Sequence, residues 1–254
     1  YKTLITNFAS LSEAFSQKAE GEDSDDRESY VAPIVNSKFQ ETVFQKAFHA
    51  VGEDIANTSY DASVVVDEQH KYLVGIKSFG LDSGDQKIAQ FKKDSQSWNE
   101  LLSEIRFQAD ISPDKETADK ENRARYEKLA REIASLRNQR IESSKALIKG
   151  FHSDASHVEA VYHVLMPTSK GHKPQIHVGE TTYLPVDLDN LKILGSTTKN
   201  NPTNFRFTDG QHDYKYTAAD SQLHMTFRNK EIVVDTWDVN YVEDPFYLFE
   251  HLHL

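Results

Sequence analysis

Three side chains in the first third of the chain have the chemical types needed to act on a phosphate group. Asp61 and Lys77 lie sixteen residues apart, and Glu41 precedes both. Carboxylates are ligands for hard cations such as Mg²⁺, and an ammonium group stabilises negative charge on a phosphate. Metal-assisted hydrolysis of a phosphodiester uses both. The sequence therefore poses a structural question: which elements would bring these residues together?

A β-hairpin is predicted over SYDASVVVDEQHKYLVGIKSF. Val64 to Val66 form one apolar run and Tyr72 to Ile76 form another, with polar residues between them. If the turn is centred near Gln69, antiparallel pairing places Asp61 roughly opposite Lys77. The carboxylate and the ammonium group would then be close enough to share one phosphate.

A helix is predicted just before this hairpin, in NSKFQETVFQKAF. Its apolar positions recur at helical spacing, and Asn36 or Ser37 can cap its start; these positions are Phe39, Val43, Phe44, Ala47 and Val51. Glu41 lies on the flank of this helix. If the helix packs on the hairpin, Glu41 can point toward Asp61 and Lys77.

The order of a helix with Glu, an Asp at a strand start and a hairpin ending in x-x-Lys resembles the PD-(D/E)XK nuclease superfamily, in particular its type II restriction endonucleases. The match covers about residues 36 to 91. The resemblance implies an α/β (α+β) fold with a mixed central sheet flanked by helices. It also implies Mg²⁺ as cofactor, held by Asp61 and Glu41, and catalysis by Asp61, Lys77 and Glu41.

Two positions depart from the pattern of that superfamily. Tyr60 stands where a Pro usually precedes the Asp, and Gly75 stands where a second metal-binding acid is usual, two residues before Lys77. Either another carboxylate takes over, or metal binding is weakened, or position 75 has been changed in this chain. Glu41 is the first choice for a substitute. Asp67 and Glu68 rank lower, because they are expected at the hairpin turn.

Beyond the hairpin, a helix is predicted from Gln86 to Trp98, with Gln86 and Lys87 as candidates for phosphate contacts. A long helix is predicted to open at Ser112-Pro113 and to run through Lys149. Its apolar stripe has the spacing of a seam against another helix and suggests dimerisation; the stripe consists of Tyr126, Leu129, Ile133 and Leu136. The second half of this helix is basic. Arg137 and Arg140 are therefore either a solvated face or contacts to a DNA backbone.

The C-terminal half is predicted to be rich in β-strands. Strands are expected at 157–166 and 174–184, and Asp209-Gly210 between alternating segments is a strong hairpin signal. A second hairpin is expected from LHMTF and EIVVDTWDV around Asn229-Lys230. Polar loops between the strands carry residue types that pair with base edges or phosphates, although ordinary turn chemistry also favours them. The proposed DNA-reading residues there are Lys170, Lys173, Lys199, Asn200, Asn201, Asn204, Arg206 and Lys215.

Composition restricts the class of protein. The 254 residues carry a net charge of −11, so DNA binding requires a basic surface on an otherwise acidic body. The acidic segment 19–30 contributes much of this charge. There is no cysteine, no stretch long enough for a membrane span and no signal peptide, so a cytoplasmic location is expected. Eleven scattered histidines show no zinc-ligand spacing.

These observations predict a single domain over 1–254, with a catalytic core at 31–98, a helical arm at 113–149 and a β-rich DNA-recognition part at 157–240. The expected function is Mg²⁺-dependent, sequence-specific cleavage of double-stranded DNA by a homodimer, whose symmetry would match a short palindrome. Two alternatives remain open. One is a catalytically inactive DNA- or protein-binding module on the same fold, and the other is a repair or recombination nuclease.

Overall fold

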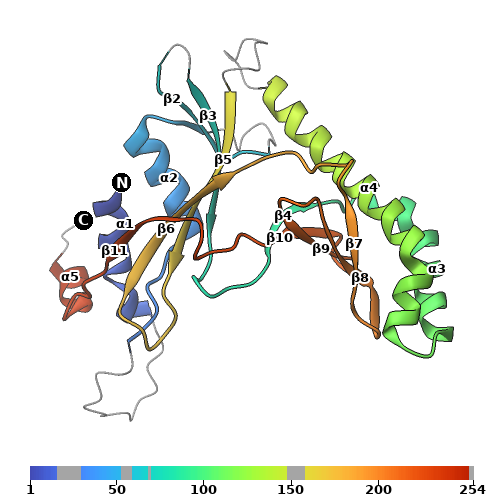
Figure 1. Cartoon of the computed structure of the whole chain (residues 1–254). Helices are drawn as coiled ribbons and strands as arrows, with labels where there is room; N and C mark the ends of the chain where they lie inside the picture. Colours follow the sequence, from blue (N-terminus) through green and yellow to red (C-terminus); the bar gives the residue numbers. More distant parts are fainter. Residues whose placement is uncertain (16–29, 53–58, 68–69, 148–157, 252–254) are drawn as a thin grey trace. The chain divides into compact units, whose positions relative to one another are not determined.

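The computed structural model describes residues 1–15, 30–52, 59–67, 70–147 and 158–251. The chain divides into two compact units, each built around a sheet (Figure 1). Unit 1 comprises Tyr1–Ser83, Ala146–Tyr183 and Arg228–Leu254, and unit 2 comprises Gly84–Lys145 and Leu184–Phe227. Residues 84–98 of the expected catalytic core thus belong to unit 2. The expected β-rich part at 157–240 contributes to both units.

Unit 1 contains a mixed sheet with strand order β1-β2-β3-β5-β6-β11. Its strands are β1 (Val51–Gly52), β2 (Ala62–Val65), β3 (Lys71–Ser78), β5 (Val158–Pro167), β6 (Gln175–Thr182) and β11 (Val233–Asp238). β2 and β3 form the predicted antiparallel hairpin, and β3 pairs with β5 in parallel. This parallel pair makes the sheet mixed, and the expected α+β class is confirmed.

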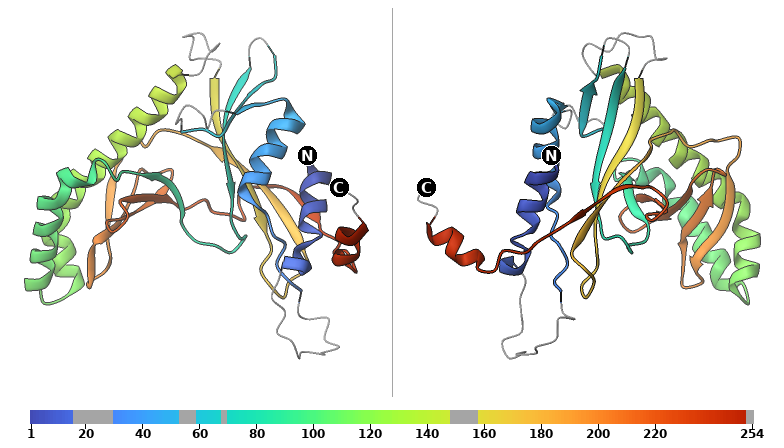
Figure 2. Two further views of the ribbon diagram at one scale, coloured as in Figure 1. Left: turned by 180° about the vertical axis from the view of Figure 1, so that it is seen from behind. Right: turned by 60° about the vertical axis from the view of Figure 1, so that its left-hand side comes forward.

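Helices pack against this sheet on the side that faces Val74 and Ile76. They are α1 (Lys2–Ala9) and α2 (Ser37–Phe48) (Figures 1 and 2). The short 3-10 helix η1 (Ser12–Phe15) follows α1, and α5 (Pro245–His251) near the C-terminus packs against η1. Phe44 of α2 packs in one core cluster with Ala62, Val74 and Ile76. The predicted cap is confirmed, because the Asn36 side chain accepts a hydrogen bond from the Phe39 amide at 2.9 Å.

Unit 2 contains an antiparallel sheet with strand order β4-β10-β9-β8-β7. Its strands are β4 (Gln86–Gln90), β7 (Lys192–Thr198), β8 (Asn201–Thr208), β9 (Asp213–Thr217) and β10 (Gln222–Met225). Its helices are the 3-10 helix η3 (Ser95–Trp98), α3 (Asn99–Ile111) and α4 (Lys115–Leu147). The hairpin predicted around Asp209-Gly210 is confirmed as β8 and β9.

Two predictions about the elements of unit 2 are wrong. Residues Gln86–Gln90 form a strand rather than the first half of a helix, because they pair with β10 along one edge of the sheet. β10 does not form a hairpin with β11: β10 pairs with β9 and β4, whereas β11 pairs with β6 in the other sheet. Alternating strands next to a polar turn do not specify which partner edge each strand will join.

Three of the four residues in the apolar stripe of the long helix are buried within unit 2, and the fourth, Leu136, is half-buried. Tyr126, Leu129 and Ile133 have no exposed surface, and the Tyr126 ring stacks on Phe205 of the sheet at 4.9 Å between centroids. The helix begins at Lys115 rather than at Ser112, and Asp114 caps it by accepting from the Thr117 amide. Because its own sheet covers the stripe, the helix needs no second subunit to bury these side chains.

Candidate active site

The hairpin brings Asp61 and Lys77 onto one face of the sheet in unit 1. Ala62 pairs with Val74, so the register is two residues from the expected one and places Asp61 opposite Gly75. Side chains alternate between the two faces of a strand, so Gly75 and Lys77 lie on the same face. Asp61 therefore lies diagonally across from Lys77, within the reach of long side chains.

Asp61 is tied to the backbone of the neighbouring strand. Its Oδ2 accepts a hydrogen bond from the Ile76 amide at 2.5 Å, and its own amide donates to the Val74 carbonyl at 2.9 Å. Asp61 and Lys77 are both half-buried. The carboxylate is thus held in a fixed place at the start of β2, beside the strand that carries Lys77.

Gly75 lies under two tyrosine rings. A Cβ atom at this position would come within 2.9 Å of the Tyr183 ring and 3.0 Å of the Tyr162 ring. These rings stack with centroids 4.0 Å apart, and the Tyr183 hydroxyl donates to the Ser59 carbonyl at 2.9 Å. The space that an acidic side chain would need here is therefore filled by aromatic carbon.

Glu41 lies on α2, which packs on the opposite face of the hairpin, and its Oε2 accepts from Lys38 Nζ at 3.0 Å. Asp67 binds His70 at the hairpin turn, far from Lys77 along the strand, and Glu68 lies outside the described residues. Within the described ranges, no three acidic, histidine or cysteine side chains are grouped so that they could hold a metal ion. The residues present do not complete the Mg²⁺ site that the resemblance implies.

The residues expected to contact DNA are spread over both units. Lys170 and Lys173 belong to unit 1, where Lys170 is exposed in the β5–β6 turn and Lys173 pairs with Asp238 at 2.8 Å. In unit 2, Lys199 donates to the carbonyls of Ser112 and Pro113, and Asn204 accepts from the Ala218 amide. Asn200 is exposed in the β7–β8 turn, and Asn201 is exposed at the start of β8.

The two arginines of the long helix support the fold of unit 2. Arg137 is only 3% exposed. Burial and the Asp209 carboxylate raise the pKa of Tyr214, and the charge of Arg137 opposes them. Arg140 donates to the Gln90 carbonyl and to Asp94, and its guanidinium lies 4.4 Å from the centre of the Phe91 ring. In this position Arg137 does not offer its charge to a ligand at the surface.

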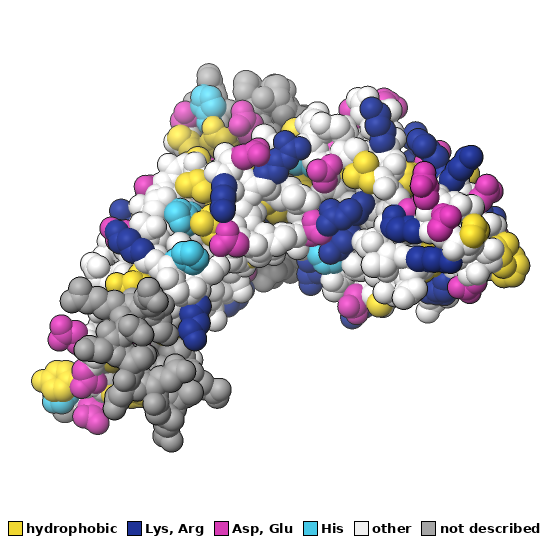
Figure 3. Space-filling model, turned by 60° about the horizontal axis from the view of Figure 1, so that its bottom comes forward, with side chains coloured by type: hydrophobic (Ala, Val, Ile, Leu, Met, Phe, Trp, Pro, Cys, Tyr) yellow, Lys and Arg dark blue, Asp and Glu magenta, His cyan; other side chains and the backbone are white. Residues whose placement is uncertain are grey.

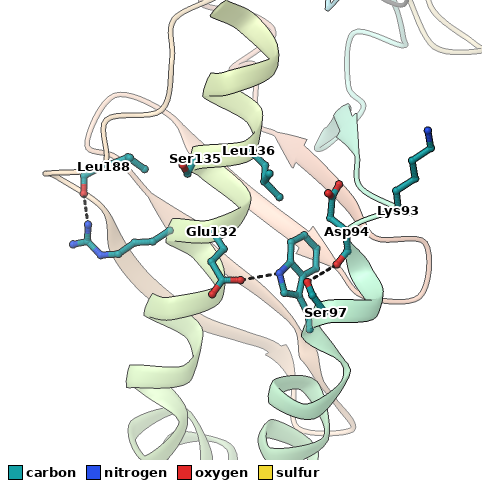
Figure 4. A pocket seen from close by; sticks show the side chains of 9 residues that line it. Lys93, Asp94, Ser97, Glu132, Ser135, Leu136 and Leu188 are labelled. Carbon is teal, nitrogen blue, oxygen red and sulfur yellow. Dashed lines mark hydrogen bonds between the residues drawn. The ribbon is translucent and has the colours of Figure 1, made fainter. Parts of the chain in front are cut away.

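Unit 2 also contains an open pocket of about 700 Å³ between η3 and α4 (Figure 4). Several of its polar groups bind one another: Trp98 Nε1 donates to Glu132 at 2.8 Å, and Arg131 donates to the Leu188 carbonyl at 3.0 Å. The pocket therefore lacks a set of convergent groups that would define one ligand. Its lining consists of Lys93, Asp94, Ser97, Trp98, Arg131, Glu132, Ser135, Leu136 and Leu188.

Charge is mixed on one face of the molecule. On the face drawn in Figure 3, Lys and Arg side chains stand among Asp and Glu side chains. No helix among the described residues is long and apolar enough to cross a membrane.

No protein-family model, curated protein or solved structure matches the chain.

Proposed function

We propose that this chain hydrolyses phosphodiester bonds in double-stranded DNA, in the manner of a type II restriction endonuclease. The observation that supports this function is the register of β2 and β3. In this register Asp61 lies opposite Gly75, and Lys77 follows Gly75 by two residues on β3. The side chains of Asp61 and Lys77 therefore project from the same face of adjacent strands. A carboxylate and an ammonium group at this separation can act on the same phosphate.

In this function Lys77 supplies positive charge to the scissile phosphate. Its ammonium group stabilises the negative charge that grows on the phosphate oxygens and orients the attacking water. Asp61 is held in place by the hydrogen bond from the Ile76 amide to its Oδ2, and in this function its carboxylate would accept a proton or bind a cation. A Mg²⁺ ion would need a second carboxylate from outside the hairpin, because Gly75 contributes none.

The test is digestion of phage DNA by the purified protein with Mg²⁺, with Mn²⁺ and with EDTA. We expect discrete fragments from the parent protein and none from Asp61→Asn or Lys77→Met. Lys71→Met is the matched control, because Lys71 lies on the same strand and the same face, at its far end. Absence of cleavage by the parent protein in every metal condition would exclude hydrolysis, whatever the protein binds.

A second candidate function is DNA binding without cleavage, on the same fold. The packing of Tyr162 and Tyr183 over Gly75 favours it, because this packing occupies the position of an acid that the nuclease superfamily usually has. A gel-shift experiment with duplex DNA distinguishes the two candidates. The non-cutting protein would shift the duplex, leave it intact and be insensitive to Asp61→Asn.

Cleavage of both strands of a palindrome would require two copies of the chain. The seam of α4 offers little surface for this contact, since unit 2 buries Tyr126, Leu129 and Ile133 and leaves only Leu136 half-buried. Sedimentation of the protein with and without a duplex measures whether a dimer forms. A monomer that nicks one strand would instead fit a repair or recombination nuclease.

A further inference from the structure

A row of basic side chains crosses four adjacent strands of the sheet in unit 2. The strand register pairs Arg206 with Lys215, Lys215 with His224, and His224 with Lys87. Paired residues on neighbouring strands project from the same face of a sheet. These four residues, here named the cation row, therefore stand side by side on one face.

The cation row is on the polar face of this sheet. The opposite face carries side chains that are almost completely buried, including Phe205, Tyr216 and Leu223, and α4 packs there through Tyr126. On the polar face, the side chains of Arg206 and Lys215 are 38% and 27% exposed, and Lys87 is exposed. The charged ends of these side chains are thus accessible to a ligand.

Asp85 organises two members of the cation row. Its carboxylate forms ion pairs with Arg206 and with Lys215, the latter at 3.1 Å, and accepts from the Thr226 hydroxyl at 2.8 Å. Burial works against ionisation of Asp85. The hydrogen bonds from Thr226 and Lys215 and the charges of Arg206 and Lys215 outweigh it, so the pKa of Asp85 stays below its usual range. The two cations are therefore held in place before any ligand arrives.

The charge balance of the row is positive even with this acid included. Arg206, Lys215 and Lys87 carry three positive charges against the one negative charge of Asp85. Burial lowers the pKa of His224, and the charges of Lys215 and Lys87 lower it further, as expected for an imidazole among cations. An anion placed on the row would relieve this repulsion.

We propose that the cation row binds the phosphate backbone of duplex DNA. Three strand spacings give the row a length of about 14 Å. This length suits several successive phosphates, which follow one another at about 3.4 Å of helix axis on each strand. Such contacts position DNA without distinguishing bases. The inference rests on the proposed function in taking DNA as the ligand, and it assigns Arg206 and Lys215 to the backbone rather than to base reading.

The test is binding of a fluorescent 30-base-pair duplex, measured by anisotropy with EDTA over a series of NaCl concentrations. Arg206→Gln/Lys215→Gln should weaken binding at least tenfold at low salt and reduce the slope of log K against log salt by about 2. Asp85→Asn should strengthen binding severalfold, because it removes the internal competitor of the phosphates. Misfolding cannot account for changes in these two opposite directions.

The matched control is Arg123→Gln/Lys128→Gln, which removes the same charge from exposed positions of α4. Equal losses in both double variants, or unchanged binding in all of them, would overturn the cation row. If the parent protein binds DNA tightly through the cation row but does not cleave it, the proposed hydrolysis would be overturned and the cation row would stand. If the row variants cleave DNA at low salt as well as the parent protein does, the cation row would be overturned and the proposed hydrolysis would stand.

Discussion

Gly75 shows how one residue can decide what a site is able to hold. The position pairs with Tyr162 on β5 and lies under the ring of Tyr183. An added Cβ would approach both rings more closely than carbon atoms normally do, and the Tyr183 hydroxyl is anchored to Ser59. Glycine is therefore required by packing at this position, and Gly75→Glu would not simply restore a missing metal ligand.

We predict that Gly75→Ala lowers the free energy of unfolding by about 1–3 kcal/mol, the usual cost of overpacking a filled core. Urea denaturation of the parent protein and of Gly75→Ala measures this difference in the free energy of unfolding. Gly80→Ala is the control, because a Cβ at Gly80 has no atom within 4 Å. Equal stability of the two variants would mean that the tyrosine rings move aside at little cost, and Gly75→Glu would then be worth testing for activity.

Asp85 connects stability to pH. Because its pKa is lowered in the folded protein, it stabilises the fold at pH values above about 3.9, the unfolded value. This contribution is lost as pH falls through the folded pKa. We therefore expect Asp85→Asn to be less stable than the parent at pH 7, with a smaller difference at pH 3. Urea midpoints at both pH values measure it, and an unchanged difference would contradict the ion-pair account.

At the scale of elements, the long helix is fixed to its sheet by one polar contact inside an apolar interface. The Tyr126 hydroxyl donates to the Pro202 carbonyl at 2.8 Å, and both groups are buried. Burial, with a further contribution from Asp119, raises the pKa of Tyr126, so its hydroxyl stays protonated and able to donate. This bond fixes how far α4 can slide along β8.

We predict that Tyr126→Phe destabilises unit 2 by about 1–3 kcal/mol, because a buried carbonyl then loses its donor. The stacking on Phe205 is retained, so the fold should persist. Thermal unfolding followed by circular dichroism measures the effect. Tyr247→Phe in α5 is the control, because Tyr247 is exposed. An equally stable Tyr126→Phe variant would show that water replaces the lost donor.

At the scale of the whole molecule, each unit has a buried core of its own, and each contains one of the two tryptophans. Trp237 is 5% exposed in unit 1, and Trp98 is 2% exposed in unit 2. We predict two unfolding transitions, since separate cores can unfold separately. Tryptophan fluorescence of Trp98→Phe and Trp237→Phe in urea reports one unit each. Coincident midpoints in both variants would instead indicate a single cooperative fold.

Local pattern in the sequence was sufficient for several elements but not for the strand register, since it predicts Asp61 opposite Lys77 whereas Asp61 lies opposite Gly75. The capped helix after Asn36, the hairpin that carries Asp61 and Lys77, and the strands around Asp209-Gly210 all follow from periodicity and turn chemistry. The same turn sets Arg206 opposite Lys215. These features depend on neighbours within a few residues, which is why local rules suffice.

Only the tertiary structure decided which strands share a sheet and what surrounds each residue of the proposed sites. Lys87 joins His224 because β4 pairs with β10, although more than a hundred residues separate them. Tyr183 reaches Gly75 by crossing β5, and the charged Arg137 is buried in unit 2. Such contacts depend on the arrangement of distant elements, and the free energy that selects this arrangement comes from burial of the whole core rather than from any local pattern.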